Sequence, residues 1–184
     1  MYQTNLIKRC KQGDEAAFKE LYQTYKHCWF SICSRYMSNR NLASDMLQNA
    51  LIKIISRIHQ FDYVKGTFPA WSNKIVVNEC LEYLRSQMHK HNTKELNADS
   101  QMIYNGLTPI DTISATELVS LIQRLPDGYR AVFNLHAIEG YTHKEVADKL
   151  NITEGTSKSQ YFKARKILQK QVEYLTNFRT YGKI

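Results

Sequence analysis

Lysine and hydroxyl side chains gather near the end of the sequence, and their chemistry is that of binding rather than catalysis. Lysines neutralise phosphates, and serine and threonine hydroxyls form hydrogen bonds with base edges. The alternative is a solvated helix face, because lysines are exposed by default. The candidate DNA-binding residues are Thr142, Lys144, Thr156, Lys158, Ser159, Phe162, Lys163 and Lys166.

Other residue patterns give little support to an enzyme. The sequence has no carboxylate cluster, no metal-ligand spacing and no phosphate-binding glycine loop. His27, Cys28 and Cys33 could be imagined as metal ligands, but thiols buried or half-buried on a helix are the simpler interpretation. The four cysteines form no CxxC pair and are expected to stay reduced. We therefore predict no catalytic site, no metal and no cofactor.

The elements that position the candidate DNA-binding residues are two short helices. Thr142 and Glu145 match a capping box, which begins a helix over residues 142–150. Asn151 tolerates left-handed backbone, and Thr153 can cap a second helix that runs to about residue 170. Two helices joined by a three-residue turn, the second with a basic outer face, are typical of a helix-turn-helix.

The rest of the chain is also predicted to be helical. Apolar residues recur at helical spacing over residues 8–88, which predicts buried stripes along amphipathic helices. Residues 89–111 are polar and aperiodic, and a structureless run of that length argues for two domains. The predicted fold is all-α, with two small helical domains over residues 8–88 and 112–172 and a flexible linker over 89–111.

Charge and hydropathy limit the classes of binding partner and the compartment that we expect for the protein. The chain has 25 Lys and Arg against 17 Asp and Glu, a net charge of +8, and basic residues predominate in both predicted domains. A basic surface attracts nucleic acid or anionic membranes. No signal peptide is visible at the N-terminus, and no apolar run reaches the roughly 18 residues of a membrane span. We predict a cytoplasmic protein without membrane insertion.

Three segments of the C-terminal half resemble promoter-binding region four of the sigma-70 family of bacterial RNA polymerase sigma factors. They are residues 125–133 (LPDGYRAVF), 139–147 (EGYTHKEVA) and 154–159 (EGTSKS). A helix-turn-helix alone would also suit a response regulator, so the N-terminal half decides between the two. No alternating strand–helix pattern typical of a phospho-acceptor domain occurs there.

The N-terminal half resembles region two of the same family. Residues 45–50 (DMLQNA) are similar to the Asp-x-x-Gln core of region 2.2. Further resemblance to regions 2.3 and 2.4 lies at Phe61, Phe68, Trp71, Ile75, Asn78, Leu84 and Arg85. The order of these segments, with a linker in place of a third domain, identifies the chain as a member of the extracytoplasmic-function (ECF) group.

The resemblance implies a surface for core RNA polymerase. Asp45, Gln48 and Ile52 lie opposite the buried stripe of their predicted helix, and an exposed Ile between polar groups suits helix docking. In the family this face grips the clamp helices of the β′ subunit. The alternative is that these polar residues are merely solvated.

The resemblance also implies a surface for the −10 element of promoter DNA. In the family, the loop before the last region-two helix receives a base flipped from the non-template strand, and the helix reads its neighbours. Residues 61–68 would form that pocket, although the aromatic residues could instead be core. The predicted −10 residues are Phe61, Phe68, Lys74, Asn78 and Arg85.

The remaining implications concern region four and the partners. Region four is expected to dock on the −35 major groove and on the flap of the polymerase β subunit. Members of the group are usually held by an anti-sigma factor, often membrane-bound, and catalysis belongs to the polymerase. The alternatives are a free-standing helix-turn-helix regulator and, with little support, a nucleic-acid enzyme.

A few positions depart from the family pattern. Asn49 replaces a usual Glu, Ser72 stands where Leu follows the Trp, and Gln160 replaces a frequent Arg. Ser157 occupies a core-facing position usually held by Val, so we expect looser packing there by about 1 kcal/mol or more. These departures bear on the promoter sequence rather than on the fold.

Overall fold

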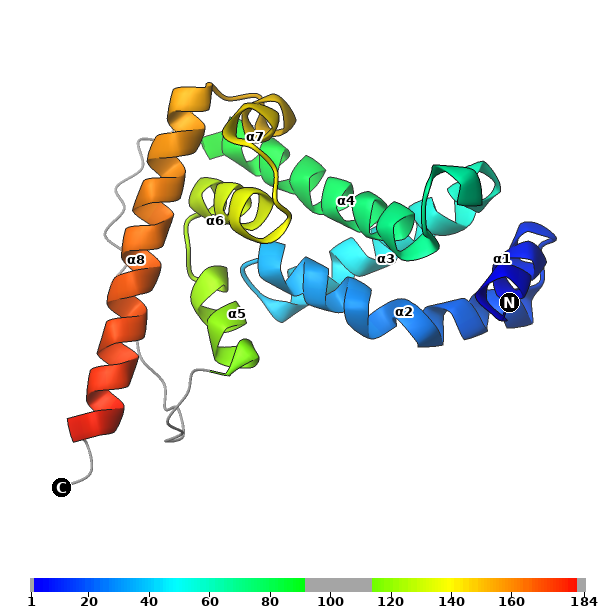
Figure 1. The fold of residues 1–184 in the computed structure, drawn as a ribbon, viewed down its shortest axis with the longest axis horizontal. Coiled ribbons are helices and arrows are strands. Elements are labelled where there is room, and N and C mark those ends of the chain that lie inside the picture. Colours follow the sequence, from blue (N-terminus) through cyan, green and yellow to red (C-terminus); the bar gives the residue numbers. More distant parts are fainter. Residues whose placement is uncertain (1, 92–113, 182–184) are drawn as a thin grey trace. The chain divides into compact units, whose positions relative to one another are not determined.

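The computed structural model describes residues 2–91 and 114–181, with side chains described over 3–87 and 114–176. Every regular element in these two stretches is a helix (Figure 1). The chain divides into two compact units, residues 1–82 and 83–184. The prediction of an all-α fold with two helical domains is confirmed, and the predicted linker lies almost wholly outside the described residues.

The first unit is built from helices, several of which begin at a side-chain cap. They are α1 (Tyr2–Lys11), α2 (Glu15–Tyr36), α3 (Arg40–Arg57), the short 3-10 turns η1 (Ile58–Gln60) and η2 (Tyr63–Lys65), and α4 (Phe68–His91). Asp14 Oδ1 accepts a hydrogen bond from Ala17 N at 3.1 Å, and Asn39 Oδ1 accepts one from Leu42 N at 3.0 Å. Each side chain satisfies an amide that the following helix cannot bond itself.

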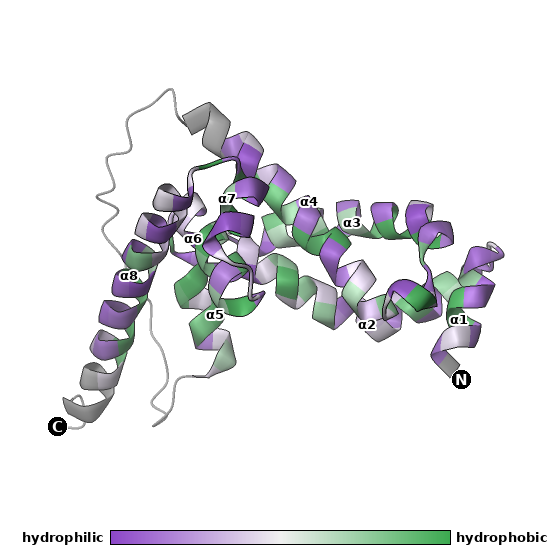
Figure 2. Ribbon diagram, turned by 45° about the horizontal axis from the view of Figure 1, so that its top comes forward, coloured by the Kyte–Doolittle hydropathy of each residue, from purple (hydrophilic) through white to green (hydrophobic). Residues whose placement is uncertain are grey.

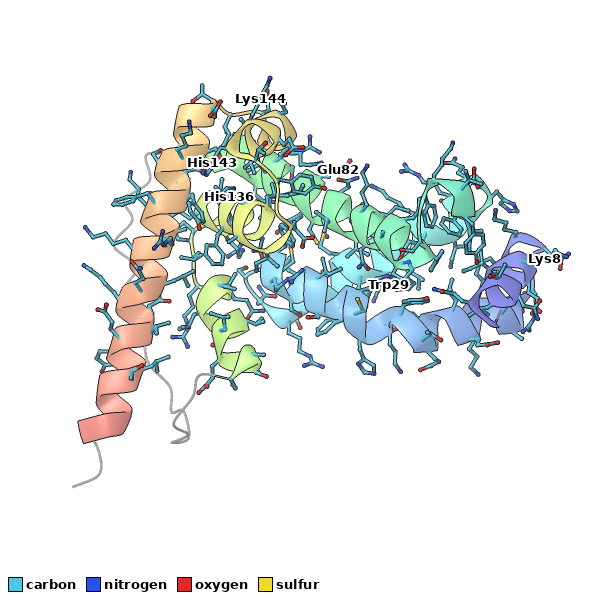
Figure 3. All side chains as sticks on the ribbon, viewed as in Figure 1. Lys8, Trp29, Glu82, His136, His143 and Lys144 are labelled. Atoms are coloured by element: carbon cyan, nitrogen blue, oxygen red, sulfur yellow. The ribbon has the colours of Figure 1, made fainter. Side chains whose placement is uncertain are left out.

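The core of the first unit contains a polar pair that the sequence did not reveal. Trp29 of α2 is fully buried, and its Nε1 donates a hydrogen bond to Ser72 Oγ of α4 at 3.2 Å. Ser72 in turn donates to the carbonyl of Pro69 at 3.2 Å. The serine that replaces the usual Leu is therefore a hydrogen-bonded core residue, and Trp29 is marked in Figure 3.

The second unit packs short helices on a long one. Its elements are α5 (Ala115–Gln123), α6 (Asp127–Phe133), the π-helical turn η3 (Asn134–Ile138), α7 (His143–Leu150) and α8 (Glu154–Tyr181). Hydrophobic and hydrophilic residues alternate around α8 in Figure 2, as amphipathic packing requires. Its core cluster consists of Leu121, Ile122, Leu125, Ala164, Leu168 and Leu175.

Helix α8 is longer than the sequence predicted. We expected it to end near Lys170, but it continues to Tyr181. Leu175 is only 4% exposed and belongs to the same cluster as Leu121 of α5. Burial of this apolar residue extends the helix past the polar residues 169–171 (Gln-Lys-Gln), where the apolar pattern of the sequence is interrupted.

Candidate nucleic-acid interface

The helix-turn-helix begins with the capping box that the sequence predicted. Thr142 N donates to Glu145 Oε2 at 2.8 Å, and Glu145 N donates to Thr142 Oγ1 at 3.3 Å. The bond from the Thr142 amide holds the pKa of the Glu145 carboxyl below its ordinary value. The Thr142 hydroxyl is thus engaged at the start of α7, although the residue remains exposed.

The turn between α7 and α8 also follows the prediction. Asn151 has φ 55° and ψ 49°, the left-handed conformation that asparagine tolerates. Thr153 Oγ1 accepts a hydrogen bond from Thr156 N at 3.0 Å and lies 2.8 Å from Thr156 Oγ1. The Thr156 hydroxyl is therefore part of the helix cap, which leaves it less free for DNA than we expected.

Helix α8 presents a polar outer face. Ser157 and Ala164 are fully buried and Thr156 is half-buried, whereas the other α8 residues predicted to face DNA are exposed, including Phe162 at 67%. Lys158 Nζ lies 2.6 Å from Glu154 Oε1, so part of its charge is already compensated by the preceding turn. The exposed residues of this face are Lys158, Ser159, Phe162, Lys163 and Lys166.

Two histidines contact α8 on the side away from its exposed face, and neither was identified from the sequence. The rings of His136 and His143 stack with centroids 4.0 Å apart at 20°, and His143 Nδ1 lies 2.9 Å from Ser157 Oγ. His136 Nδ1 lies 2.8 Å from the carbonyl oxygen of Tyr141. Both histidines are labelled in Figure 3.

The histidine contact corrects one expectation. Ser157 does not leave a loose position in the core, because its hydroxyl bonds the imidazole of His143. Tyr161, one turn along α8, meets the His136 ring edge-on with centroids 4.6 Å apart. A polar and aromatic contact thus replaces the aliphatic one that the family pattern led us to expect.

The face predicted to bind core polymerase is exposed on α3. Asp45 and Gln48 are exposed, Ile52 is 66% exposed, and Ile55 beside them is 38% exposed. Lys53, on the same helix, lies 2.5 Å from Glu79 Oε2 and 2.8 Å from Glu82 Oε2 of α4. The two ion pairs join α3 to α4 at the residue that follows Ile52.

The residues predicted for the −10 element divide into two groups. On α4, Lys74 and Asn78 are exposed and Arg85 is half-buried. Phe61 and Phe68 are buried, at 2% and 1% exposed, with ring centroids 5.4 Å apart.

Phe61 and Phe68 are therefore core residues, the alternative that the sequence left open, and their part in a −10 pocket stays a prediction. Their rings form an aromatic cluster with that of Trp71. The exposed part of this loop is instead its tip, where Tyr63 is 42% and Val64 93% exposed. No pattern in the sequence favoured these two residues over the phenylalanines.

Metal and membrane features were sought over the described stretches, 2–91 and 114–181. No group of three or more His, Cys, Asp and Glu side chains there could hold a metal ion. Cys10, Cys33 and Cys80 are buried and Cys28 is exposed, and none of the four forms a disulfide. None of the helices within those stretches combines the length and apolar character of a membrane span.

Comparison with known proteins agrees with this geometry. Residues 21–90 match the family described as Sigma-70 region 2, and residues 115–168 match Sigma-70, region 4. The ECF RNA polymerase sigma factor SigW of Bacillus subtilis (strain 168) is 31% identical over 180 residues, which are 92% of this chain and 96% of that protein. The ECF RNA polymerase sigma-E factor of Haemophilus influenzae is 27% identical over 181 residues, which are 92% and 95%.

A solved structure shares the fold. The sigma factor RpoE of Bartonella quintana, in complex with the anti-sigma factor NepR, matches with a TM-score of 0.51 and 18% identity over 85% of this chain and 96% of that one. Both family regions occur in the expected order along one chain. The chain therefore belongs to the extracytoplasmic-function group of the sigma-70 family, the non-enzymatic factors of transcription initiation by RNA polymerase.

Proposed function

We propose that the chain divides its work between two regions. Residues 8–88 bind core polymerase and open the −10 element, and residues 112–172 dock on the −35 element and on the β flap. Residues 89–111 link the two and pass through the polymerase cleft toward the RNA exit path. A chain that works on the polymerase belongs in the cytoplasm, which is where we place it.

One observation carries this assignment of roles. The helix-turn-helix with a basic outer face occurs in the same chain as an exposed Asp45, Gln48 and Ile52 face that no described side chain of α4 covers. A DNA-binding regulator needs only the first surface. A protein that brings polymerase to a promoter needs both.

In this proposal, Asp45 and Gln48 make polar contacts with the β′ clamp helices, and Ile52 makes an apolar contact with the same helices. Lys74 and Arg85 meet phosphates of the −10 region, and Asn78 reads a base beside the loop. The exposed face of α8 enters the −35 major groove, where Ser159 and Lys163 reach base edges and Lys158 and Lys166 meet phosphates.

We also propose an anti-sigma factor as the resting partner. The Asp45 face and the α8 face are both exposed and both carry an apolar residue, Ile52 or Phe162, among polar groups. An inhibitor that covers either face would bury that residue and block the polymerase or the DNA. The Bartonella RpoE named above was solved with such a partner.

Run-off transcription tests the proposed function. Purified full-length chain and bacterial core polymerase are combined on a library of fragments from the source genome, with each protein alone as the control. We expect discrete transcripts only when both are present. Binding of the chain to DNA without initiation on any fragment would indicate a free-standing regulator and contradict the proposal.

A further inference from the structure

Helix α1 precedes the part of the chain that matches region two, which begins at residue 21. Its apolar face is nevertheless part of the core, because Leu6, Ile7 and Cys10 are buried. The turn to α2 places Gly13 at φ 84°, a conformation that favours glycine. Helix α1 is thus folded back onto its own unit rather than left as a loose N-terminal extension.

An ion-pair network fixes the end of α1. Arg9 Nε donates to Asp14 Oδ2 at 2.8 Å, and Arg9 also lies 3.3 Å from Glu20 Oε2. The hydrogen bond from the Ala17 amide, and after it the bond from Arg9, hold the pKa of the Asp14 carboxyl below its ordinary value. The last turn of α1 is therefore bonded through Arg9 to Asp14 in the turn and to Glu20 in α2.

From this fixed position α1 contacts the loop of residues 61–68 twice. Lys11 Nζ donates to the carbonyl oxygen of Phe61 at 2.6 Å and lies 5.8 Å from the centroid of the Phe61 ring. The Tyr63 hydroxyl donates to the carbonyl oxygen of Gln3 at 3.2 Å. One contact is made by a charged side chain to the loop backbone, and the other by a loop side chain to the helix backbone.

Bonds within the loop shape its tip. Lys65 N donates to the Asp62 carbonyl oxygen at 3.1 Å, and Gly66 N donates to the Tyr63 carbonyl oxygen at 3.4 Å. Asp62 Oδ1 accepts from Val64 N at 2.9 Å. These bonds join residues of the loop to one another and do not attach the loop to a neighbouring helix. Residues 62–67 are all exposed, while the residues at both ends, Phe61 and Phe68, are buried. The position of the exposed tip therefore depends on how firmly the Phe61 end is held.

We infer that α1 acts as a brace for the 61–68 loop, with Lys11 as a positioning residue that presents the exposed loop tip to the −10 element. The inference rests on the proposed function, in which the first region opens the −10 element and Asn78 reads a base beside this loop. A loop held in its binding shape loses less conformational entropy when DNA arrives, so capture of the base and discrimination between bases both improve.

Three variants of the full-length chain test the brace. Lys11→Met removes the ammonium and keeps most of the side-chain stem, Lys11→Arg keeps the charge, and Lys8→Met removes an exposed lysine one turn earlier on α1 as the matched control. Each is assembled with core polymerase on a promoter fragment obtained by run-off selection. Permanganate reactivity of unpaired thymines measures the rate of promoter opening on that fragment and on copies with single −10 substitutions.

We expect Lys11→Met to slow opening by about tenfold, the factor that loss of one charge-assisted hydrogen bond produces. We also expect it to reduce discrimination between the original and substituted −10 elements. Lys11→Arg should restore both, and Lys8→Met should behave as the unchanged chain. Affinity for core polymerase should be the same in all four proteins.

Other results would overturn the brace. If Lys11→Met changes neither the rate of promoter opening nor the discrimination between −10 elements, the Lys11 contact does not position the loop. If Lys11→Met lowers the affinity for core polymerase as much as it slows opening, the contact has only a structural role. If Lys11→Met fails to fold, Tyr63→Phe takes its place. This variant removes the bond from the Tyr63 hydroxyl to the Gln3 carbonyl oxygen and must weaken the discrimination between −10 elements. If the unchanged holoenzyme initiates on no fragment, the proposed function fails first and the brace fails with it.

Discussion

The imidazole of His143 at the start of α7 bonds the hydroxyl of Ser157 inside α8, with Nδ1 and Oγ 2.9 Å apart. This bond joins the two helices of the helix-turn-helix directly behind the face proposed to enter DNA. Ser157 is fully buried, so the bond is shielded from water on the α8 side. The angle between α7 and α8 thus depends on a polar contact as well as on packing.

Replacing Ser157 by valine tests this contact. Ser157→Val restores the aliphatic residue typical of the family but leaves His143 Nδ1 without its partner, so we expect a loss of about 1 kcal/mol from the stability of the second unit. Hydrogen exchange of α7 and α8 amides measures it. Trp29 and Trp71, the two tryptophans of the chain, both lie in the first unit, so their fluorescence serves as an internal control.

Ser159→Val is the matched substitution on the exposed face of the same helix. It carries the same cost of a β-branched residue in a helix but breaks no contact with His143. Equal protection in the two variants would show that the His143 bond contributes nothing.

The second prediction concerns pH. Burial, followed by the nearby His136 and Lys158, lowers the pKa of His143 below its ordinary value of 6.5. The unfolded chain therefore takes up a proton at a higher pH than the folded one, so the second unit loses stability as pH falls below about 6.5. We expect His143→Gln to remove this dependence.

Hydrogen-exchange protection of α7 between pH 7 and pH 5, corrected for intrinsic exchange, measures the effect of pH. The Glu145 carboxyl, whose pKa is held below its ordinary 4.5, contributes only at lower pH, so the two effects can be separated. A protection that is flat from about pH 7 to pH 5 in the unchanged chain would contradict the prediction for His143.

The third prediction concerns the face on α3. The double variant Asp45→Ala with Gln48→Ala should weaken binding to core polymerase by about tenfold or more, because polar contacts at a buried interface are lost. Binding to isolated −35 DNA should not change. Fluorescence anisotropy with labelled chain measures the first affinity, and a gel shift measures the second.

A control for the α3 variant is Glu15→Ala with Gln23→Ala, which likewise removes one carboxylate and one amide side chain from exposed positions, here on α2. This control should bind core polymerase normally. Loss of both polymerase and DNA binding in the α3 variant would mean that the assigned face is wrong and that the variant perturbs folding.

The fourth prediction concerns the exposed face of α8. Lys163→Ala should weaken binding to the selected −35 sequence by about 1–3 kcal/mol if its side chain reaches a base. The effect should be smaller on a −35 sequence with a substituted base. Lys19→Ala, an exposed lysine of α2, is the charge-matched control. An unchanged affinity would mean that Lys163 is only a solvated residue and makes no contact with DNA.

Local signals in the sequence were enough to place much of the helix-turn-helix. Thr142 and Glu145 are three residues apart, and Asn151 needs no distant partner to adopt its left-handed backbone, so their conformations could be predicted. The exposure of Asp45, Gln48 and Ile52 followed from helical periodicity in the same way. Each of these features is decided within one or two turns of chain.

Features that depend on distant contacts could not be predicted. The bond from His143 to Ser157 spans 14 residues, and that from Lys11 to the Phe61 carbonyl spans 50. Residues 61–68 are predicted as a loop because Gly66 and Pro69 interrupt the helical pattern, and this left the burial of Phe61 and Phe68 undecided. Their burial depends on packing against Trp71 and on the contact with α1.

Arg130 illustrates the same limit in α6. Its side chain is 2% exposed and donates 2.8 Å hydrogen bonds to the carbonyl oxygens of Gln123 and Leu125, with Asp127 as its ion-pair partner. An arginine in a sequence is expected at the surface. Only the folded chain shows it closing the end of α5.

The length of α8 has a consequence for its stability. Its 28 residues form one helix of about 42 Å, with the lysines proposed to face DNA near its N-terminal end. Ala164, Leu168 and Leu175 of this helix all belong to the cluster that contains Leu121 and Ile122 of α5. The packing of α5 therefore supports α8 along its middle and toward its C-terminal end, and truncation of α5 is expected to destabilise the helix that carries the proposed −35 face.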